Sequence, residues 1–493
     1  MASSLPSRLY RSAINFTRGK QHHSSHVQVV DDLVECPCCG EFQQLEEIAP
    51  GTVARCVRCD QLLERRNKGG PLATPLAFCI TSAALYLATL ASSLMTLNLY
   101  GRERSVDLLT GPMELLHEGW GEVGILVGLV TILAPGIVIA MMGMILTAAF
   151  FEELPDWAPH LLAWYEKLRP WSMMEVYILG IFVAYTKLVD MAHVEVGPAA
   201  YLIAALMISM AATDQTLDQE RIWQRRRVEG AIQLPDGNQV QVDRVSMADL
   251  GGHMPPPEHM LSCHSCGLVG VFPEPVPQTR SVGLCPRCGH NLCKRKNNSL
   301  SRTSALVLSA FVFYLPANLF PVMTVIKVGS GGGHTIIEGA IELWEDGMIP
   351  LSLLVLFASV TVPVAKILGL SYMIVTTKLG SKKKLMLRSK LFRIIDIIGR
   401  WSMIDVFMIS ILVAVVRFSS LANVVANAGV VSFAAVVVIT IFAAHCFDPR
   451  LMWDVAGRNG QLPEDDARAG NAVSESSGTP SPEEQDKMEP VRA

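Results

Sequence analysis

Eight apolar segments constrain the fold of this 493-residue chain more than any other feature. A helix needs about 20 apolar residues to cross the hydrocarbon core of a bilayer. Half of the residues are apolar and 17% are charged, a balance typical of membrane proteins. The segments fall at residues 72–98, 121–151, 171–190 and 196–213, and again at 303–327, 348–376, 401–418 and 423–446. We therefore expect an all-α, multi-pass membrane protein with eight transmembrane helices.

The two groups of four segments read as copies of one another. MTLNLYG, from Met95, matches MTVIKVG, from Met323, and RPWSMMEV at 169–176 matches GRWSMIDV at 399–406. Because each copy holds an even number of helices, both copies keep the same orientation in the membrane, as parallel repeats do. The sequence thus predicts two four-helix modules, at 70–227 and 300–455, that pack as a pseudo-symmetric pair.

The distribution of Lys and Arg predicts the orientation, since basic loops remain on the cytoplasmic side. The loop 377–400 carries eight basic residues against the single acid Asp396. The loops 98–119 and 327–347 carry Arg102, Arg104 and Lys327 only. We expect both termini to face the cytoplasm.

Three stretches lack the apolar residues of a packed domain. Residues 1–33 and the tail 456–493 are rich in polar, Gly, Ser, Pro and acidic residues, a composition typical of disorder. The linker 228–260, with its PPP at 255–257, reads as loosely structured.

Eight of the twelve cysteines form two sets with the spacing of zinc ribbons, at 34–66 and 261–296. Both sets read C-x2-C…C-x2-C, so that two tight turns each supply two thiolates to a tetrahedral metal. A turn residue follows each pair, as such a bend requires. The predicted ligands are Cys36, Cys39, Cys56 and Cys59, and Cys263, Cys266, Cys285 and Cys288.

A disulfide or a redox-active CxxC pair is the alternative reading of these cysteines. The cytoplasm keeps thiols reduced, which favours a metal. Four protein ligands leave no open coordination position, so we expect two structural Zn²⁺ sites, with iron as the alternative metal. Cys38 leaves the ligand register of the first set ambiguous, and Cys79, Cys293 and Cys446 are expected to be bystanders.

Ionisable residues inside the apolar segments are the candidates for a transport path. A charge at the bilayer centre costs about 2.5 to 3.5 kcal/mol on insertion scales, so such residues usually face a polar interior. By depth along the helices, at about 1.5 Å per residue, Lys366 is expected to pair with Asp405. Val138 matches Lys366 in the first copy, which leaves Glu175 without that base. The candidates are Glu175, Lys187, Asp190, Lys366, Asp405 and Arg417.

The competing interpretation of these charges is structural. Glu175 and Asp405 follow Trp171 and Trp401, so their side chains could reach the membrane interface instead of lining a path. Asp190 ends its segment, where a charge costs little.

The paired ribbons, YLPANLFPVMT at 314–324, the repeated RPWSMMEV and GRWSMIDV, and the closing FDPRLMWD at 447–454 together resemble the paraquat-inducible protein A family. The resemblance covers about residues 33–455; LDQERIWQ, the matching segment of the first copy, is a weaker version of FDPRLMWD. It implies a protein of the Gram-negative inner membrane that moves phospholipid between the inner and outer membranes. Coupling to protons is a separate hypothesis, because Glu175 has no apparent base nearby and the intramembrane acids could titrate. It also implies a periplasmic MCE-domain tunnel protein as partner, docked on the loops 98–119 and 327–347.

Two other classes of function compete with lipid transport. In a metal- or redox-responsive sensor or scaffold, the ribbons would bind a cytoplasmic partner and the helices would only anchor them. An enzyme acting on lipids or quinones would need a convergent nucleophile and base, and the sequence contains no such motif, so we expect no enzymatic activity. Nothing in the charge distribution indicates a nucleic-acid partner.

Overall fold

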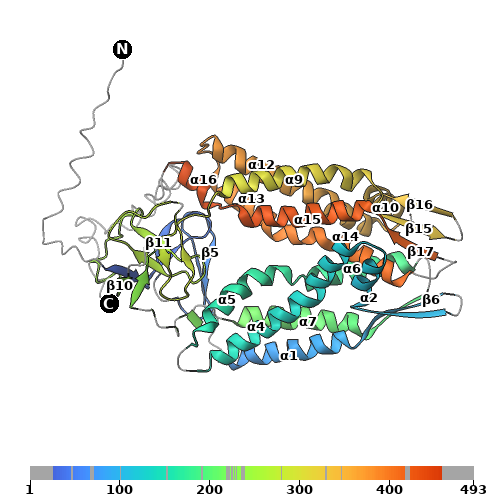
Figure 1. The fold of residues 1–493 in the computed structure, drawn as a ribbon, viewed down its shortest axis with the longest axis horizontal. Helices are drawn as coiled ribbons and strands as arrows, with labels where there is room; N and C mark the ends of the chain where they lie inside the picture. The colour runs from blue at the N-terminus through green and yellow to red at the C-terminus, as the bar shows by residue number, and fades with distance from the viewer. Residues whose placement is uncertain are drawn as a thin grey trace, which may run out of the picture.

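The computed structural model describes residues 26–45, 48–66, 72–99, 102–151, 154–189, 193–217, 222–223, 226, 228, 230–234, 239–278, 280–327, 330–345, 347–416 and 422–457. A long bundle of helices carries small β-structures at both of its ends (Figure 1). We call the end that bears the cysteine clusters the ribbon end, and the end that bears β6 and β15 the sheet end. Most of the two predicted disordered tails lies outside the described residues.

Module one runs from the ribbon end to the sheet end and back twice. Its helices are α1 (Ala73–Leu90), α2 (Thr110–His117), α3 (Gly121–Gly128), α4 (Ala134–Ala148), α5 (Trp157–Leu168), α6 (Met174–Val189) and α7 (Pro198–Thr216). A π-helical turn, Leu129–Leu133, joins α3 to α4, and a 3-10 turn, Arg169–Trp171, lies between α5 and α6. Its strands β6 (Ser93–Leu99), β7 (Arg102–Asp107) and β8 (His193–Val196) form a three-stranded sheet in the order β7-β6-β8.

Module two repeats this order of elements. Its helices are α9 (Ser299–Leu319), α10 (Ile336–Glu345), α11 (Ile349–Leu356), α12 (Val362–Lys378), α13 (Leu385–Ile398), α14 (Ile404–Val415), α15 (Ala428–Cys446) and α16 (Arg450–Val455). A π-helical turn, Phe357–Thr361, and a 3-10 turn, Gly399–Met403, recur at the matching places. Strands β15 (Met323–Lys327), β16 (Ser330–His334) and β17 (Ala422–Ala426) form the sheet β16-β15-β17. The element order therefore reproduces the duplication seen in the sequence.

Seven runs of helix in the described residues are long and apolar enough to cross a membrane. They are Ala73–Leu90, Gly121–Ala148, Trp157–Val189, Ser299–Leu319, Ile349–Lys378, Leu385–Val415 and Ala428–Cys446. The fourth predicted segment, 196–213, corresponds to α7 (Pro198–Thr216), which is not among them and carries Asp214 in its last turn. In the fold, α7 packs along α1 as α15 packs along α9. The chain is thus a mostly helical, multi-pass membrane protein.

The prediction of an all-α chain is wrong at the sheet end. The first and fifth apolar segments were expected to continue as helix to residues 98 and 327, but α1 ends at Leu90 and α9 at Leu319. The residues that follow form the central strands β6 and β15, each paired on both sides. In β6 the side chains of Met95 and Leu97 are buried while those of Thr96 and Asn98 are less so, because a sheet covered on one face buries alternate residues. Leu94, at the register shift between Ser93 and Met95, is buried as well.

The ribbon end contains more order than the sequence indicated. A five-stranded sheet joins β1 (Val27–Val30), β9 (Ala231–Gln233), β10 (Gln239–Val245), β11 (Met260–Ser262) and β12 (Val269–Val271) in the order β11-β12-β1-β10-β9. β1 belongs to the predicted disordered N-terminus, and β9 and β10 belong to the predicted loose linker. β1 pairs with β10 across 215 positions of sequence, for instance Val27 with Val242, so its place in the sheet depends on the folded chain.

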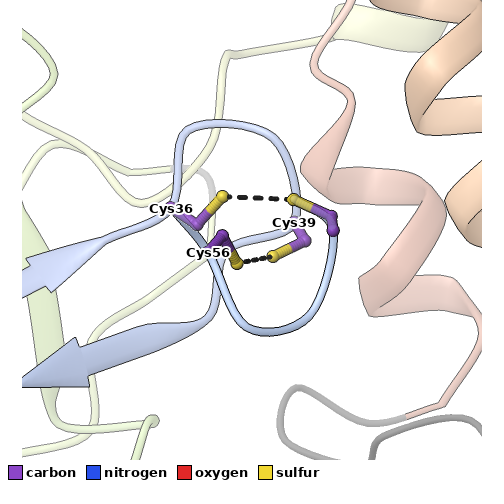
Figure 2. Close-up of side chains that lie close together, drawn as sticks. Cys36, Cys39 and Cys56 are labelled. Atoms are coloured by element: carbon purple, nitrogen blue, oxygen red, sulfur yellow. Dashed lines mark hydrogen bonds between the residues drawn. The ribbon is translucent and has the colours of Figure 1, made fainter. Parts of the chain in front are cut away.

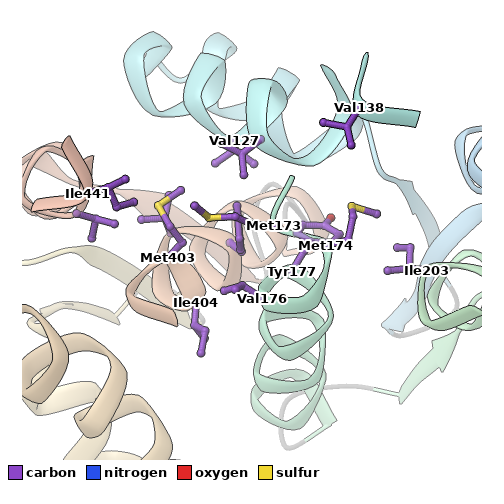
Figure 3. Close-up of a cluster of buried hydrophobic side chains, with 14 of the residues drawn as sticks. Val127, Val138, Met173, Met174, Val176, Tyr177, Ile203, Met403, Ile404 and Ile441 are labelled. Atoms are coloured by element: carbon purple, nitrogen blue, oxygen red, sulfur yellow. The ribbon is translucent and has the colours of Figure 1, made fainter. Parts of the chain in front are cut away.

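The two modules meet where α6 packs against α14. Figure 3 shows Met173 and Val176 of module one beside Met403 and Ile404 of module two. The ring of Tyr177 lies edge-on to that of Phe407, with centroids 5.4 Å apart. All twelve residues of α14 are buried, because α2, α3, α6 and α15 surround this helix.

Candidate metal centres and buried charges

Each cysteine set converges on one point. The four sulfur atoms of Cys36, Cys39, Cys56 and Cys59 lie within 4.8 Å of one another, and so do those of the second set, Cys263, Cys266, Cys285 and Cys288. Across the first cluster the Sγ atoms of Cys36 and Cys59 are 3.5 Å apart, and those of Cys39 and Cys56 are 3.6 Å apart. Figure 2 shows the first cluster held between two loops that face each other. All eight cysteines are buried and none forms a disulfide.

The turns that carry these cysteines explain the convergence. After each pair the backbone enters a left-handed conformation, at Gly40 (φ 75°), Asp60 (φ 59°), Gly267 (φ 71°) and Gly289 (φ 68°). The amide of that residue donates to the carbonyl of the first cysteine of its pair, at 2.8 to 2.9 Å. The hydrogen bond closes a tight loop that points both thiols of the pair to one side. The predicted turn residues are confirmed.

The donor set fits a tetrahedral thiolate-bound metal. Zn–S bonds of about 2.3 Å in a tetrahedron place the sulfurs about 3.8 Å apart, close to the spacing of 3.5 Å across the second cluster. Cys38 is buried beside the first cluster but is not one of its four converging residues, an arrangement that favours the predicted ligand register. The two clusters are therefore candidate sites for a structural metal.

The ribbons dock crosswise on the modules. Ribbon one precedes module one in the chain, yet its cysteines pack in one cluster with residues of α12, α13 and α16 of module two. The guanidinium of Arg58 lies 4.4 Å from the ring centroid of Trp453, and Arg393 donates to the carbonyl of Cys59 at 3.0 Å. Ribbon two packs on module one, where Arg287 donates to the carbonyl of Trp223 at 3.0 Å. The two contacts are equivalent: in each ribbon the arginine before the last cysteine, Arg58 or Arg287, contacts a tryptophan at the end of a module, Trp453 or Trp223.

A buried ionic cluster joins ribbon one to module two. Arg295 donates to Glu35 Oε1 at 3.0 Å and to Asp454 at 2.6 Å. Arg450 donates to the same Glu35 oxygen at 3.2 Å and to Asp448 at 3.0 Å. The side chains of Glu35, Arg295, Asp448 and Arg450 are at most 7% exposed. Each carboxylate therefore has arginine partners that offset the cost of its burial.

Arg450 extends this cluster to ribbon two. Its Nη2 lies 2.9 Å from Nε2 of His264, the residue that follows the ligand Cys263. Burial opposes ionisation of Asp448, but the charge and hydrogen bonds of Arg450 outweigh this and hold the pKa of Asp448 below its usual value. Burial and the positive charge of Arg450 lower the pKa of His264 to about 4. Arg450 is thus bonded to residues of both ribbons and to its own module.

Within the membrane segments, the predicted pairing of Lys366 with Asp405 is wrong. Lys366 Nζ donates to the carbonyl of Gly399 at 2.7 Å and to Thr440 Oγ1 at 3.3 Å. Both oxygens of Asp405 are buried without a hydrogen-bond partner among the described residues. Both residues are only 2% exposed, so both are buried inside the protein.

The remaining path candidates have different surroundings. Glu175 is exposed and lines a cavity in module one. Lys187 is half-buried, and its Nζ lies 3.6 Å from the point where a Cβ on Gly339 of module two would stand. Asp190 and Arg417 lie outside the described residues.

Sequence reasoning missed the ionic cluster at the ribbon end. Glu35 directly precedes the predicted ligand Cys36, and Asp448, Arg450 and Asp454 belong to the FDPRLMWD motif. The sequence alone predicted no ion pair for any of them. The charged residues of this segment stand among the large apolar residues Phe447, Met452 and Trp453. That mixture could have indicated that the segment is buried against another part of the chain.

Comparison with known proteins places these features in a family. The model of the paraquat-inducible protein A family matches residues 72–227 and again 300–456. The chain is 28% identical over 435 residues to intermembrane transport protein PqiA of Escherichia coli, which covers 88% of this chain and 97% of that protein. It is also 28% identical to lipophilic envelope-spanning tunnel protein A of E. coli, across 88% of this chain and 94% of the relative.

A more distant relative and the solved structures complete the comparison. A probable intermembrane transport protein of Haemophilus influenzae is 21% identical over 86% of this chain and 95% of its own length. No solved structure matches the chain. Because the family model covers both repeats and more than half of the residues, this chain belongs to the paraquat-inducible protein A family.

Proposed function

We propose that this protein is an inner-membrane component of a system that moves phospholipid between the two membranes of a Gram-negative envelope. The observation that carries the proposal is the family match of both modules, together with relatives that bear the name of intermembrane transport proteins over nearly their full length. The protein is a transporter and not an enzyme. Its periplasmic partner is an MCE-domain protein, in line with the resemblance stated above.

The proposed topology has eight transmembrane helices, with α7 as the eighth. Two observations support this number: α7 is 19 residues long and occupies in module one the place of α15 in module two. With four helices in each module, both ribbons and both termini lie in the cytoplasm. The basic residues of α13 and of the preceding turn lie at the ribbon end, in agreement with the positive-inside rule. The two sheets then face the periplasm and the partner.

The proposed transport path follows the interface of α6 and α14. It includes Glu175, Lys187, Lys366 and Asp405, and by their place in the sequence Asp190 and Arg417. The carboxylate of Asp405 supports this path, because it is buried without a hydrogen-bond partner among the described residues and such a costly group inside a membrane segment usually serves a function. The metal proposed for both clusters is Zn²⁺, which thiolate tetrahedra bind in structural sites.

The proposal is tested by following phospholipid between the membranes of living cells. A Gram-negative host that lacks its own family members is pulsed with labelled glycerol, and labelled phospholipid is then measured in separated inner and outer membranes. We expect the wild-type chain, expressed with its partner, to change the transfer rate, and Asp405→Asn to abolish that change. Transfer that responds to Cys36→Ser in folded protein but not to Asp405→Asn would favour the sensor or scaffold.

A further inference from the structure

Module one contains a polar cavity at its ribbon end. The cavity has a volume of about 60 Å³, enough for several water molecules, and lies between α1, α4, α5, α6 and α7. Arg400, from the 3-10 turn of module two, completes its wall. Arg169 and Asp214 line both this cavity and a larger one of about 1170 Å³ that reaches the two ribbons. The polar cavity therefore lies just inside the membrane module, beside the ribbons.

Some of the charges around the cavity already satisfy one another. Asp214 accepts hydrogen bonds from Arg169 Nε at 3.0 Å and from the hydroxyl of Tyr165 at 2.7 Å. Arg169, Asp214 and Tyr165 therefore form a hydrogen-bonded group on the side of the cavity that faces the ribbons. The group has no net charge, since the guanidinium of Arg169 neutralises the carboxylate of Asp214.

Three other groups on the wall have no partner within the described part of the chain. The hydroxyl of Ser172 is buried and makes no hydrogen bond. The guanidinium of Arg400 and the carboxylate of Glu175 form no ion pair among the residues that the structure describes, although both line the same cavity. The wall of this cavity thus offers a hydroxyl donor from Ser172, a cation from Arg400 and an anion from Glu175 to a ligand.

In module two the hydroxyl that matches Ser172 is satisfied internally. Ser402, which matches Ser172, donates to the carbonyl of Gly399 at 3.0 Å. Lys366, which matches Val138 of the cavity wall, places its ammonium 2.7 Å from the same carbonyl. Asp405, which matches Glu175, also lacks a hydrogen-bond partner among the described residues, so an unpaired carboxylate recurs in both modules. The unpaired hydroxyl of Ser172 is particular to module one, and a buried polar group of this kind calls for a ligand.

The chemistry of the three groups defines that ligand. A guanidinium with a neighbouring hydroxyl binds a phosphodiester, and a carboxylate binds an ammonium. A headgroup with a phosphate alone would satisfy Arg400 but leave Glu175 unpaired beside an anion. A zwitterion with both a phosphodiester and an ammonium satisfies all three groups.

We propose that this cavity binds the headgroup of a zwitterionic aminophospholipid, with the phosphodiester on Arg400 and Ser172 and the ammonium on Glu175. The inference rests on the proposed lipid transport and names the headgroup class and the entry site. The cavity lies at the level where the headgroups of the leaflet beside the ribbons would stand. Lipid of that leaflet enters module one here.

Lipid retention by the intact protein tests this site. The full chain is purified in detergent, equilibrated with equal amounts of phosphatidylethanolamine and phosphatidylglycerol, and its bound lipids are identified by native mass spectrometry. We expect wild type to prefer the ethanolamine lipid, and Glu175→Gln to lower this preference about ten-fold, because a hydrogen-bonded charge contributes about 1.5 kcal/mol or more. Arg400→Gln should lower the binding of both lipids.

Controls separate the site from folding and from lipid transport in general. Glu195→Gln removes an exposed carboxylate at the sheet end of the same module and should keep the wild-type preference. If Arg400→Gln lowers the unfolding temperature, Ser172→Ala replaces it as the phosphate-side variant. An unchanged preference in Glu175→Gln overturns the headgroup site while lipid transport stands. Wild type that retains no phospholipid overturns the site and contradicts the proposed function as well.

A soluble zwitterion is the other source of this chemistry. Glycerophosphoethanolamine carries the same phosphodiester and ammonium without acyl chains, so we expect it not to displace bound lipid at equal concentration. Displacement by the soluble compound would overturn the assignment to a membrane lipid.

Discussion

Glu35 and Arg295 are 260 positions apart in the chain, yet their side chains are hydrogen bonded at 3.0 Å and only 2–3% exposed. The contact connects the first metal ribbon to the segment that enters module two. It follows from the crosswise docking of the ribbons, which makes each module depend on the ribbon that precedes the other.

Removing the carboxylate of this pair should destabilise the ribbon end. In Glu35→Gln the guanidinium groups of Arg295 and Arg450 stay buried with less compensation, a change that costs about 3 to 5 kcal/mol. We expect a clearly lower unfolding temperature by scanning fluorimetry. Asp31→Asn is the control, because Asp31 and Arg244 form an exposed pair at 3.6 Å that contributes about 0 to 1 kcal/mol. Equal effects of the two variants would contradict the structural role of Glu35.

The metal content should follow the two cysteine clusters. We expect two metal ions per wild-type chain by elemental mass spectrometry, one in Cys36→Ser and one in Cys263→Ser, because a missing thiolate opens the tetrahedron. Cys38→Ser and Cys293→Ser should retain both ions, since neither residue belongs to a cluster. Loss of an ion in Cys38→Ser would show that the ligand register of ribbon one is different.

Loss of the metal from ribbon one should also reveal the crosswise docking. When Cys36→Ser removes the metal of ribbon one, Arg58 and Arg393 lose their fixed contacts on module two. We expect faster trypsin cleavage in the basic segment 381–393, which belongs to module two. Cleavage that rises only next to module one would contradict the docking.

Neutralising Lys366 should separate stability from transport. Gly399 keeps the hydrogen bond from Ser402 when Lys366→Met removes the ammonium, so no carbonyl is left bare. Replacing a buried charge by an apolar side chain of similar size is often neutral in stability. We expect an unfolding temperature close to wild type and a loss of lipid transfer in the labelled-glycerol assay. Val138→Met, at the matching place in module one, is the size-matched control, and wild-type transfer in Lys366→Met would remove this residue from the path.

The close approach of the modules should be sensitive to one methyl group. A Cβ on Gly180 would stand 2.9 Å from Cβ of Phe407, so Gly180→Ala forces α6 and α14 apart. Overpacking of this kind costs about 1 to 3 kcal/mol. Gly230→Ala, where a Cβ meets nothing within 4 Å, is the control for the unfolding measurement. A Gly180→Ala protein as stable as this control would mean that α6 and α14 can move apart without loss of stability.

The stabilisation that Asp448 provides should depend on pH. Its pKa is lower in the folded protein, so the contribution is complete above the unfolded value of about 3.9 and is lost as the pH falls through the folded pKa. We expect Asp448→Asn to unfold at a lower temperature than wild type at pH 7, with a difference that shrinks below about pH 4. Any loss of metal at low pH affects wild type and Asp448→Asn equally, so the difference between their unfolding temperatures still reports the ion pair. A difference that stays constant down to pH 3 would contradict the ion pair with Arg450.

Part of the site was predictable because it depends on local sequence. The C-x2-C spacing and the turn residue after each pair indicate which thiols converge, since a tight turn fixes both cysteines within a few residues. The pairing of Lys366 was not predictable in this way. Helix rise gives the depth of a residue in the membrane, but the partner depends on the direction around the bundle in which the side chain points.

The sequence by itself determined the membrane embedding, the duplication and the two cysteine sets, because apolar length, repeat offset and ligand spacing are properties of the chain. The tertiary structure alone decided that ribbon one docks on module two and ribbon two on module one. Two homologous modules offer similar docking surfaces, so local sequence cannot select between them. The choice depends on contacts such as Glu35 with Arg295 and Arg58 with Trp453, whose residues meet only in the folded chain.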